Sequence, residues 1–270
     1  MSASMQEENM HDLLPIRHTA NIMDSMMKYF WLSQFDIPAG SGYPLFGWQH
    51  LLCLFFISAA VFFSLRVFSI HGRRFRDTVL KAIPLLLCLL EIWKDSVLII
   101  EGYFSRGFLP LHLCSLGIPL FFMQAYTKSP RWKSILGEIS FCLIMPGAAF
   151  ALLDPDWNSL YPMLNFFNLH SYIWHFLLIL FPVLLLYNRE IAPAIRHIHY
   201  ELLFLLAVVP PIYIFDKCFD CNYLFVNWPV PDTPLEIMAR YMGNPGYLAG
   251  YAVFVILCIV IIYIPFCFRR

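Results

Sequence analysis

Residues 109–126 read LPLHLCSLGIPLFFMQAY, an apolar segment that contains one histidine and one cysteine. About 18 apolar residues are enough for a helix to cross the hydrocarbon core of a membrane. Imidazole is the commonest side-chain base near neutral pH, and a thiol becomes a strong nucleophile once a base takes its proton. His112 and Cys114 therefore point to covalent chemistry where this segment enters the membrane, although a cysteine in a membrane helix is also an ordinary packing residue.

The whole chain has the composition of a membrane protein. Of its 270 residues, 60% are hydrophobic and only 13% are charged, and the mean hydropathy is +0.65. A soluble domain of this length would be far more polar. We therefore expect an all-α, polytopic membrane protein with a single bundle of about seven transmembrane helices, near residues 45–66, 79–100, 109–126, 134–153, 169–187, 199–216 and 246–267.

The basic residues predict how the bundle is oriented. Twelve Lys and Arg residues fall in the first, third and fifth connections and in the C-terminal tail, against five on the opposite side. Basic residues collect on the cytoplasmic side of membrane proteins. This places the N-terminus outside and the C-terminus in the cytoplasm. The net charge of zero says nothing about partners. No glycine-rich phosphate loop is present, and we expect no nucleic acid partner, nucleotide, metal or other cofactor.

The chain divides into two parts. Residues 1–43 form an extracytoplasmic segment without a cleavable signal pattern, and residues 44–270 form the transmembrane domain. Within the first part, apolar residues at helical spacing predict a short amphipathic helix on the outer interface, formed by Met23, Met26, Met27, Phe30 and Trp31.

Polar residues that suit chemistry gather at the outer ends of the predicted helices. His50, His112, Cys114 and His170 lie where helices enter from outside, and Asp216 lies where one leaves. The neighbouring positions add Glu101, Asn165, Asn168, Asn222 and Tyr223. We expect these side chains to converge on one outward-facing pocket.

The residue spacing favours a base from another helix for Cys114. On a regular helix, His112 and Cys114 point about 200° apart. His170 lies at a matching depth and is the better candidate, whereas His175 lies about 7.5 Å deeper and is expected to be a buried packing or supporting residue.

Glu91, Lys94 and Asp95 interrupt the second predicted span. Each charge costs about 2.5 to 3.5 kcal/mol in hydrocarbon, so the three residues should face the interior and pair. They are either a structural ion pair or the central site of a small transporter or ion-coupled carrier.

The cysteines leave two further readings open. Cys218 and Cys221 are spaced like a redox or metal pair, for which a disulfide is more plausible than zinc. His50, His112, Cys114 and His170 are also the ligands of a third hypothesis, a metal-binding membrane protein. The other five cysteines read as packing residues: Cys53, Cys88, Cys142, Cys258 and Cys267.

Five short motifs resemble one family. They are YPLFG at 43–47 before His50, LPLHLCS at 109–115, NFFNLH at 165–170, NYLF at 222–225 and PDTPL at 231–235. Together they resemble the YwaF-like integral membrane proteins over about residues 43–265. The resemblance implies a bacterial cell membrane as the location. Eukaryotic relatives are regarded as acyltransferases that remodel ether-linked phospholipids with a cysteine and a histidine, which implies Cys114 and His170 here.

The leading hypothesis is a membrane-embedded acyltransferase, or lipid acyl hydrolase, whose substrates are membrane lipids. Cys114, deprotonated by His170, would attack a phospholipid ester and hold the acyl group as a thioester. His112 or Asn168 would donate to the oxyanion, and Asp216 or Glu101 would orient the histidine. The sequence does not select the lipid or the oligomeric state.

Overall fold

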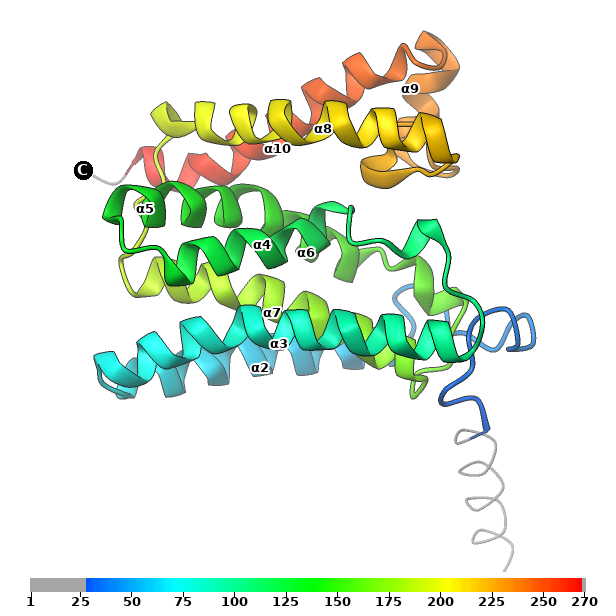
Figure 1. Cartoon of the computed structure of the whole chain (residues 1–270), viewed down its shortest axis with the longest axis horizontal. Coiled ribbons are helices and arrows are strands. Elements are labelled where there is room, and N and C mark those ends of the chain that lie inside the picture. Colours follow the sequence, from blue (N-terminus) through cyan, green and yellow to red (C-terminus); the bar gives the residue numbers. More distant parts are fainter. Residues whose placement is uncertain (1–27, 269–270) are drawn as a thin grey trace, which may run out of the picture.

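The computed structural model describes residues 28–268, and within that range it is helical and contains no strand (Figure 1). The α-helices are α2 (Trp48–Ile70), α3 (Arg73–Ile100), α4 (Leu113–Tyr126), α5 (Pro130–Ile139), α6 (Met145–Leu153), α7 (Phe166–Tyr187), α8 (His199–Phe219), α9 (Pro234–Met242) and α10 (Tyr247–Cys267). Short helical turns lie between them: η1 (Arg106–Phe108), the π-helical η2 (Ser140–Ile144), η3 (Asp156–Ser159), η4 (Ile195–His197) and η5 (Tyr223–Phe225).

The prediction of a multi-pass helical membrane protein is confirmed, but the predicted number of seven spans is not. Five helical segments are long and apolar enough to cross a membrane: Trp48–Ile70, Pro130–Ser159, Phe166–Tyr187, Ile195–Phe219 and Tyr247–Cys267. The remaining two, α3 and α4, lie alongside them in the bundle (Figure 1). α3 is long enough, but Glu91, Lys94 and Asp95 reduce its apolar character.

α4 falls short because it has only 14 residues. The predicted segment began at Leu109, whereas the helix begins at Leu113. Pro110 disfavours a helical conformation at the residue before it, and the chain runs extended through His112. The polar start of this segment therefore lies in a loop that leads into the helix.

α7 is the centre of the bundle. In its most apolar window 61% of the residues are buried inside the protein, against 6% in α2, 11% in α8 and 17% in α10. Its Phe181 stacks on Phe121 of α4, with ring centroids 4.2 Å apart. Gly117 of α4 allows a close approach of the two helices, since a Cβ atom there would lie 2.8 Å from a methyl carbon of Leu178. This contact fixes the first turn of α4, which carries Cys114, against α7.

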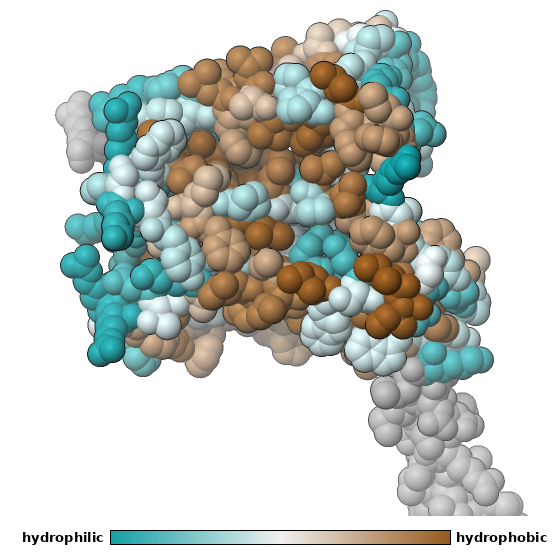
Figure 2. All heavy atoms as spheres, viewed as in Figure 1, coloured by the Kyte–Doolittle hydropathy of each residue, from teal (hydrophilic) through white to brown (hydrophobic). Residues whose placement is uncertain are grey.

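The connections alternate between the two ends of the bundle. The turns from α2 to α3, from α4 to α5 and from α7 to α8 lie at the end where the chain terminates, on the left of Figure 1. Residues 28–47, the loop after α3 and α9 lie at the opposite end. Hydrophilic residues line the left end and apolar residues cover the middle of the visible face (Figure 2). The amphipathic helix predicted at Met23–Trp31 falls largely on residues 1–27, outside the described residues, and the domain boundary at 43 stays a prediction.

Candidate active site

Cys114 is the second residue of α4, and its side chain packs beside the main apolar core. His112 precedes the helix in an extended conformation, with φ −69° and ψ 155°, and its side chain does not cap the helix. The angle of about 200° expected from regular helical geometry therefore does not apply to this pair. The first backbone N–H groups of a helix have no intrahelical acceptor, so this turn offers free donors beside the thiol.

Aromatic residues of η5 cover His112. The imidazole packs against Tyr223 at a centroid distance of 4.8 Å and against Phe225 at 5.9 Å. The Tyr223 hydroxyl donates a hydrogen bond to the carbonyl of Arg106, in the loop before α4. Burial, with a smaller contribution from nearby acidic groups, raises the pKa of Tyr223 to about 12. The phenol therefore stays protonated at neutral pH and holds η5 over the start of α4.

His170 lies buried in the second turn of α7. Its Nε2 is 3.1 Å from the carbonyl oxygen of Leu90 in α3, and its ring stacks on Trp174 at 5.7 Å. A carbonyl only accepts, so this contact places the ring proton on Nε2. The other nitrogen, Nδ1, is left as the basic atom.

The charges of α3 pair with one another near the turn of α3 that contacts His170. Lys94 Nζ lies 2.8 Å from Glu91 Oε1 and 3.3 Å from Asp95 Oδ1. The contact with Glu91 is a hydrogen bond, whereas Asp95 Oδ1 accepts no hydrogen bond from the described residues. Leu90, whose carbonyl contacts His170, lies one helical turn before Lys94 on α3. The sequence treated these charges as a separate feature, and the structure packs His170 against the same part of α3.

The thiol itself is not engaged. Among the described residues, no hydrogen bond joins Cys114 to His112 or to His170. Lys94, Cys114 and His170 come from α3, α4 and α7, which pack on one another, and His112 lies just before α4. No hydrogen-bonded pair of thiol and imidazole is formed among these residues.

The ion pairs of Lys94 give a stability prediction. Replacing Lys94 with methionine leaves the buried carboxylate of Glu91 and the partly buried carboxylate of Asp95 without their cation, so we expect the free energy of unfolding to fall by about 3 kcal/mol. Lys81→Met, at an exposed position on the same helix, should cost less than about 1 kcal/mol. Unfolding of both variants in detergent measures this. Equal losses would mean that Glu91 and Asp95 are solvated and do not depend on Lys94.

Three other predicted site residues make structural hydrogen bonds that do not involve Cys114. His50 is fully buried, accepts from the backbone N–H of Phe46 and contacts the carbonyl of Leu152 at 2.9 Å. Asn168 accepts from the Tyr43 hydroxyl and donates to the carbonyl of Met163. His175 contacts the carbonyl of Ser171 at 2.7 Å and stacks on Trp157 at 5.2 Å. The structure brings none of the three into hydrogen-bond contact with Cys114.

Asn165 begins α7. Its side chain accepts from the N–H of Phe167 and donates to the carbonyls of Tyr29 and Leu32. These bonds tie the N-terminal segment to the start of the helix that carries His170.

The remaining predicted residues lie at the same end of the bundle. Glu101 ends α3 and lies near Tyr103. Asp216 is fully buried, and neither of its carboxylate oxygens has a good hydrogen bond, although the N–H of Tyr223 approaches them. Asn222 accepts from the N–H groups of Asn227 and Trp228. Asp216 and Asn222 thus shape the loop that places Tyr223 over His112.

The cysteine pair of this loop is not bridged. Cys218 is exposed and Cys221 is buried, and both are free. Within residues 28–268, no group of three or more His, Cys, Asp or Glu side chains is placed to hold a metal ion. The metal-binding hypothesis therefore gains no support from the geometry.

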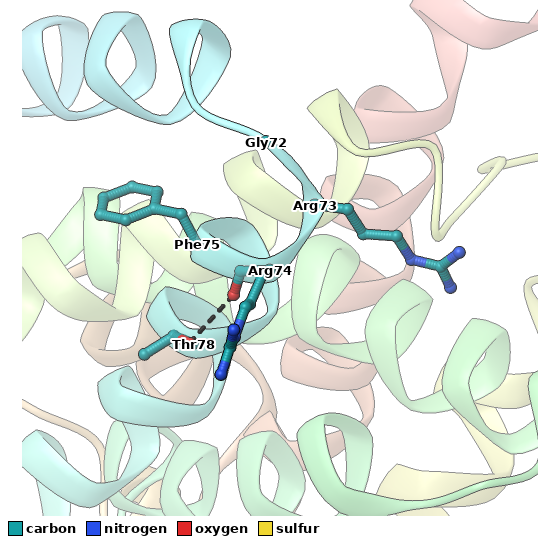
Figure 3. A pocket seen from close by; sticks show the side chains of 5 residues that line it. All are labelled: Gly72, Arg73, Arg74, Phe75 and Thr78. Atoms are coloured by element: carbon teal, nitrogen blue, oxygen red, sulfur yellow. Dashed lines mark hydrogen bonds between the residues drawn. The ribbon is translucent and has the colours of Figure 1, made fainter.

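Two open clefts occur at opposite ends of the bundle. One, of about 520 Å³, is lined by Ser105–Gly107, Phe219–Asn222 and Trp228 and adjoins the loop that covers His112. Its Arg106 guanidinium packs over Phe219 at 4.8 Å. The other, of about 560 Å³, lies at the turn between α2 and α3 (Figure 3). There Thr78 donates to the carbonyl of Arg74, and Arg73 points away from both. The second cleft lies at the far end from Cys114.

Sequence reasoning missed one buried polar group, Glu138 and Glu201 with Tyr263 between them. Both carboxylates lie inside predicted spans, at 134–153 and 199–216. A charge count per span marks each carboxylate, but it does not indicate that the two lie together.

These features define a class: a multi-pass helical integral membrane protein with a cysteine and two histidines near one end of an apolar bundle. The comparison with known families is more specific. The model of the TMEM164 family matches residues 45–263, and the chain belongs to this membrane protein family. No curated protein and no solved structure matches the chain. The resemblance to YwaF-like proteins stays a prediction, because the match names another family.

Proposed function

We propose that this protein is a membrane-embedded acyltransferase or acyl hydrolase that acts on phospholipids through Cys114. The observation that supports the proposal is the packing of α3 against both α4 and α7: His170 of α7 contacts the Leu90 carbonyl of α3, one helical turn before Lys94, and Cys114 begins α4. A nucleophile at a helix start, with histidines from its own and a neighbouring element, is the arrangement that thiol catalysis uses.

The reaction would proceed in two halves. His170 Nδ1 takes the Cys114 proton, and the thiolate attacks the ester carbonyl carbon of a phospholipid. The resulting oxyanion receives hydrogen bonds from the N–H groups of the first turn of α4 and from His112. The tetrahedral intermediate collapses, His170 returns the proton to the leaving alkoxide, and a lysolipid departs. The acyl group remains on sulfur as a thioester.

The second half reverses these roles. A lysolipid hydroxyl, or water, gives its proton to His170 and attacks the thioester, and the Cys114 thiolate leaves with a proton from the imidazolium. The proposal requires His170 Nδ1 to reach the thiol when lipid is bound. Catalytic hydrogen bonds are often longer in the free enzyme than in its complexes.

The surroundings suit a lipid substrate. The cleft beside Arg106 offers a guanidinium for a phosphate group, with Asp220 and Trp228 for an amine-bearing headgroup. α8 and α10 are mostly unburied along their apolar windows, so acyl chains have an apolar surface beside the cleft. We place the headgroup in this cleft and the chains against these helices.

The proposal includes a topology. We infer that α3 and α4 cross the membrane together with the five apolar segments, because both lie alongside them. The basic residues then place the N-terminus outside and the C-terminus in the cytoplasm. A bacterial cell membrane remains the predicted location.

An acyl-transfer assay with purified protein tests the function. The protein is reconstituted in phospholipid vesicles with an isotope-labelled lysophospholipid, and lipid products are measured by mass spectrometry. We expect labelled diacyl phospholipid if a lysolipid is the acceptor, or free fatty acid if water is. If neither forms and the vesicles instead show protein-dependent ion flux, the protein is a carrier and α3 holds its site.

A further inference from the structure

A second polar site lies at the opposite end of the bundle, inside the protein. Glu138 of α5, Glu201 of α8 and Tyr263 of α10 are all completely buried. The Tyr263 hydroxyl lies 3.1 Å from Glu138 Oε1 and 3.0 Å from Glu201 Oε1. A single phenol group thus bridges two carboxyl groups that come from different helices.

Glu138 has the partners of an ionised carboxylate. Its Oε1 accepts from the backbone N–H of Ala194 at 3.1 Å, and His197 Nδ1 lies 3.0 Å from its Oε2. On its other side, the ring of His197 accepts a hydrogen bond from Arg196 Nε at 3.2 Å. Nε2 therefore carries no proton, and Nδ1 donates to Glu138. With the phenol, this carboxylate has three donors.

Glu201 has the opposite environment. Its Oε2 has no hydrogen-bond partner among the described residues, and the only N–H that approaches the side chain is its own. No ion pair joins it to a cation among residues 28–268. Two ionised carboxylates sharing one phenol in an apolar interior would repel each other without compensation.

The single hydrogen of the Tyr263 hydroxyl indicates which of the two carboxyl groups carries a proton. The phenol has one hydrogen but makes two short contacts with carboxyl oxygens. If Tyr263 donates to Glu138, the contact with Glu201 is a hydrogen bond only when Glu201 carries the proton and donates to the phenol oxygen. The thiol of Cys142, in the π-helical segment η2, also approaches the phenol; a thiol is a weak donor and acceptor, and the two lone pairs of the phenol oxygen can accept from both Cys142 and Glu201.

We propose that Glu201 is a proton-binding site, and that its bound proton closes α8 and α10 against α5. Contacts of α8 with α5 and of α10 with η2 and η4 lie at this end of the bundle. Release of the proton would put a second charge beside Glu138 and weaken these contacts. The groups that face the proton are Glu138, His197 with Arg196 behind it, Tyr263 and Cys142.

Infrared spectroscopy of the purified protein tests this inference independently of any enzymatic activity. At neutral pH, wild type should show a carbonyl band of a protonated carboxylic acid that shifts in D₂O. Glu201→Gln should remove this component. Glu190→Gln is the matched control and should leave the band intact, because Glu190 accepts from Gln124 and Asn188 and lies near Lys133. A band that Glu201→Gln does not change would overturn the proposal.

The pH dependence of stability gives a second readout. In wild type, raising the pH from 6 to 9 favours loss of the Glu201 proton, so the melting temperature should fall more than in Glu201→Gln. At pH 8 the Gln variant should melt at the same or a higher temperature, whereas Glu138→Gln should melt lower. If the Gln side chain prevents folding, Glu201→Met replaces it. Parallel pH curves for wild type and variant would contradict a proton on Glu201.

Discussion

Replacing Cys114 with alanine will remove acyl transfer while leaving the protein folded. The substitution takes away the atom that carries the acyl group, so turnover should fall by about 10⁴-fold or more. The side chain is only partly buried and has no hydrogen bond to the part of the chain that the structure describes, so the loss of stability should be small. Product formation from labelled lysolipid measures turnover, and the melting temperature measures folding.

Cys258→Ala is the matched control for this prediction. Cys258 is also a free and partly buried cysteine, but it lies in α10, away from the start of α4. Its removal should leave turnover within about twofold of wild type. Turnover that survives in Cys114→Ala would exclude the thioester route, whatever other chemistry the protein performs.

The second large effect is expected at His170, and it separates the roles of the two histidines. His170→Ala removes the general base and should lower turnover by about 10²- to 10⁴-fold at neutral pH. A higher pH forms the thiolate without a base, so this deficit should shrink as the pH rises. His112→Ala removes one oxyanion donor and should cost about 10²-fold with little dependence on pH.

His199→Ala is the control for both histidine variants, because His199 is exposed at the opposite end of the bundle. It should not change turnover. If His112→Ala shows the pH-dependent loss and His170→Ala does not, the base is His112. The extended conformation of His112, just outside the helix, makes that exchange of roles geometrically reasonable.

Hydropathy predicted the helical membrane architecture because a long apolar run has few alternatives to a membrane helix. The first residue of α4 was harder to predict from the sequence. Leu109 and Leu111 are as apolar as the residues that follow, and only Pro110 indicates that the helix starts later. The number of crossing segments depends on α3, whose internal charges are costly in lipid unless neighbouring helices cover them.

The candidate site was only partly predictable. The sequence singled out Cys114, His112 and His170 as candidates, because reactive residues at the ends of apolar segments are unusual. It did not predict that His170 packs on α3 one turn from Lys94, since the separation of residues 94 and 170 in the chain says nothing about helix packing. Asn168 and His175 looked equally reactive in sequence, and their side chains are instead hydrogen-bonded to the nearby backbone carbonyls of Met163 and Ser171.

The pairing of Glu138 and Glu201 could not be predicted from the sequence. Each is a single charge near one end of a span, where a side chain normally reaches the membrane surface. The structure instead turns both inward to Tyr263, 62 residues from Glu201 and 125 from Glu138. Such a pairing depends on which faces of α5, α8 and α10 meet.

The most direct measurement is the intact mass of the purified protein after incubation with mixed phospholipids. The account predicts a mass increase of one fatty acyl group, which hydroxylamine removes and which Cys114→Ala prevents. His170→Ala should form the same adduct more slowly. If neither an adduct nor a lysolipid product forms in wild type, or if the adduct persists in Cys114→Ala, the acyl-thioester account is wrong.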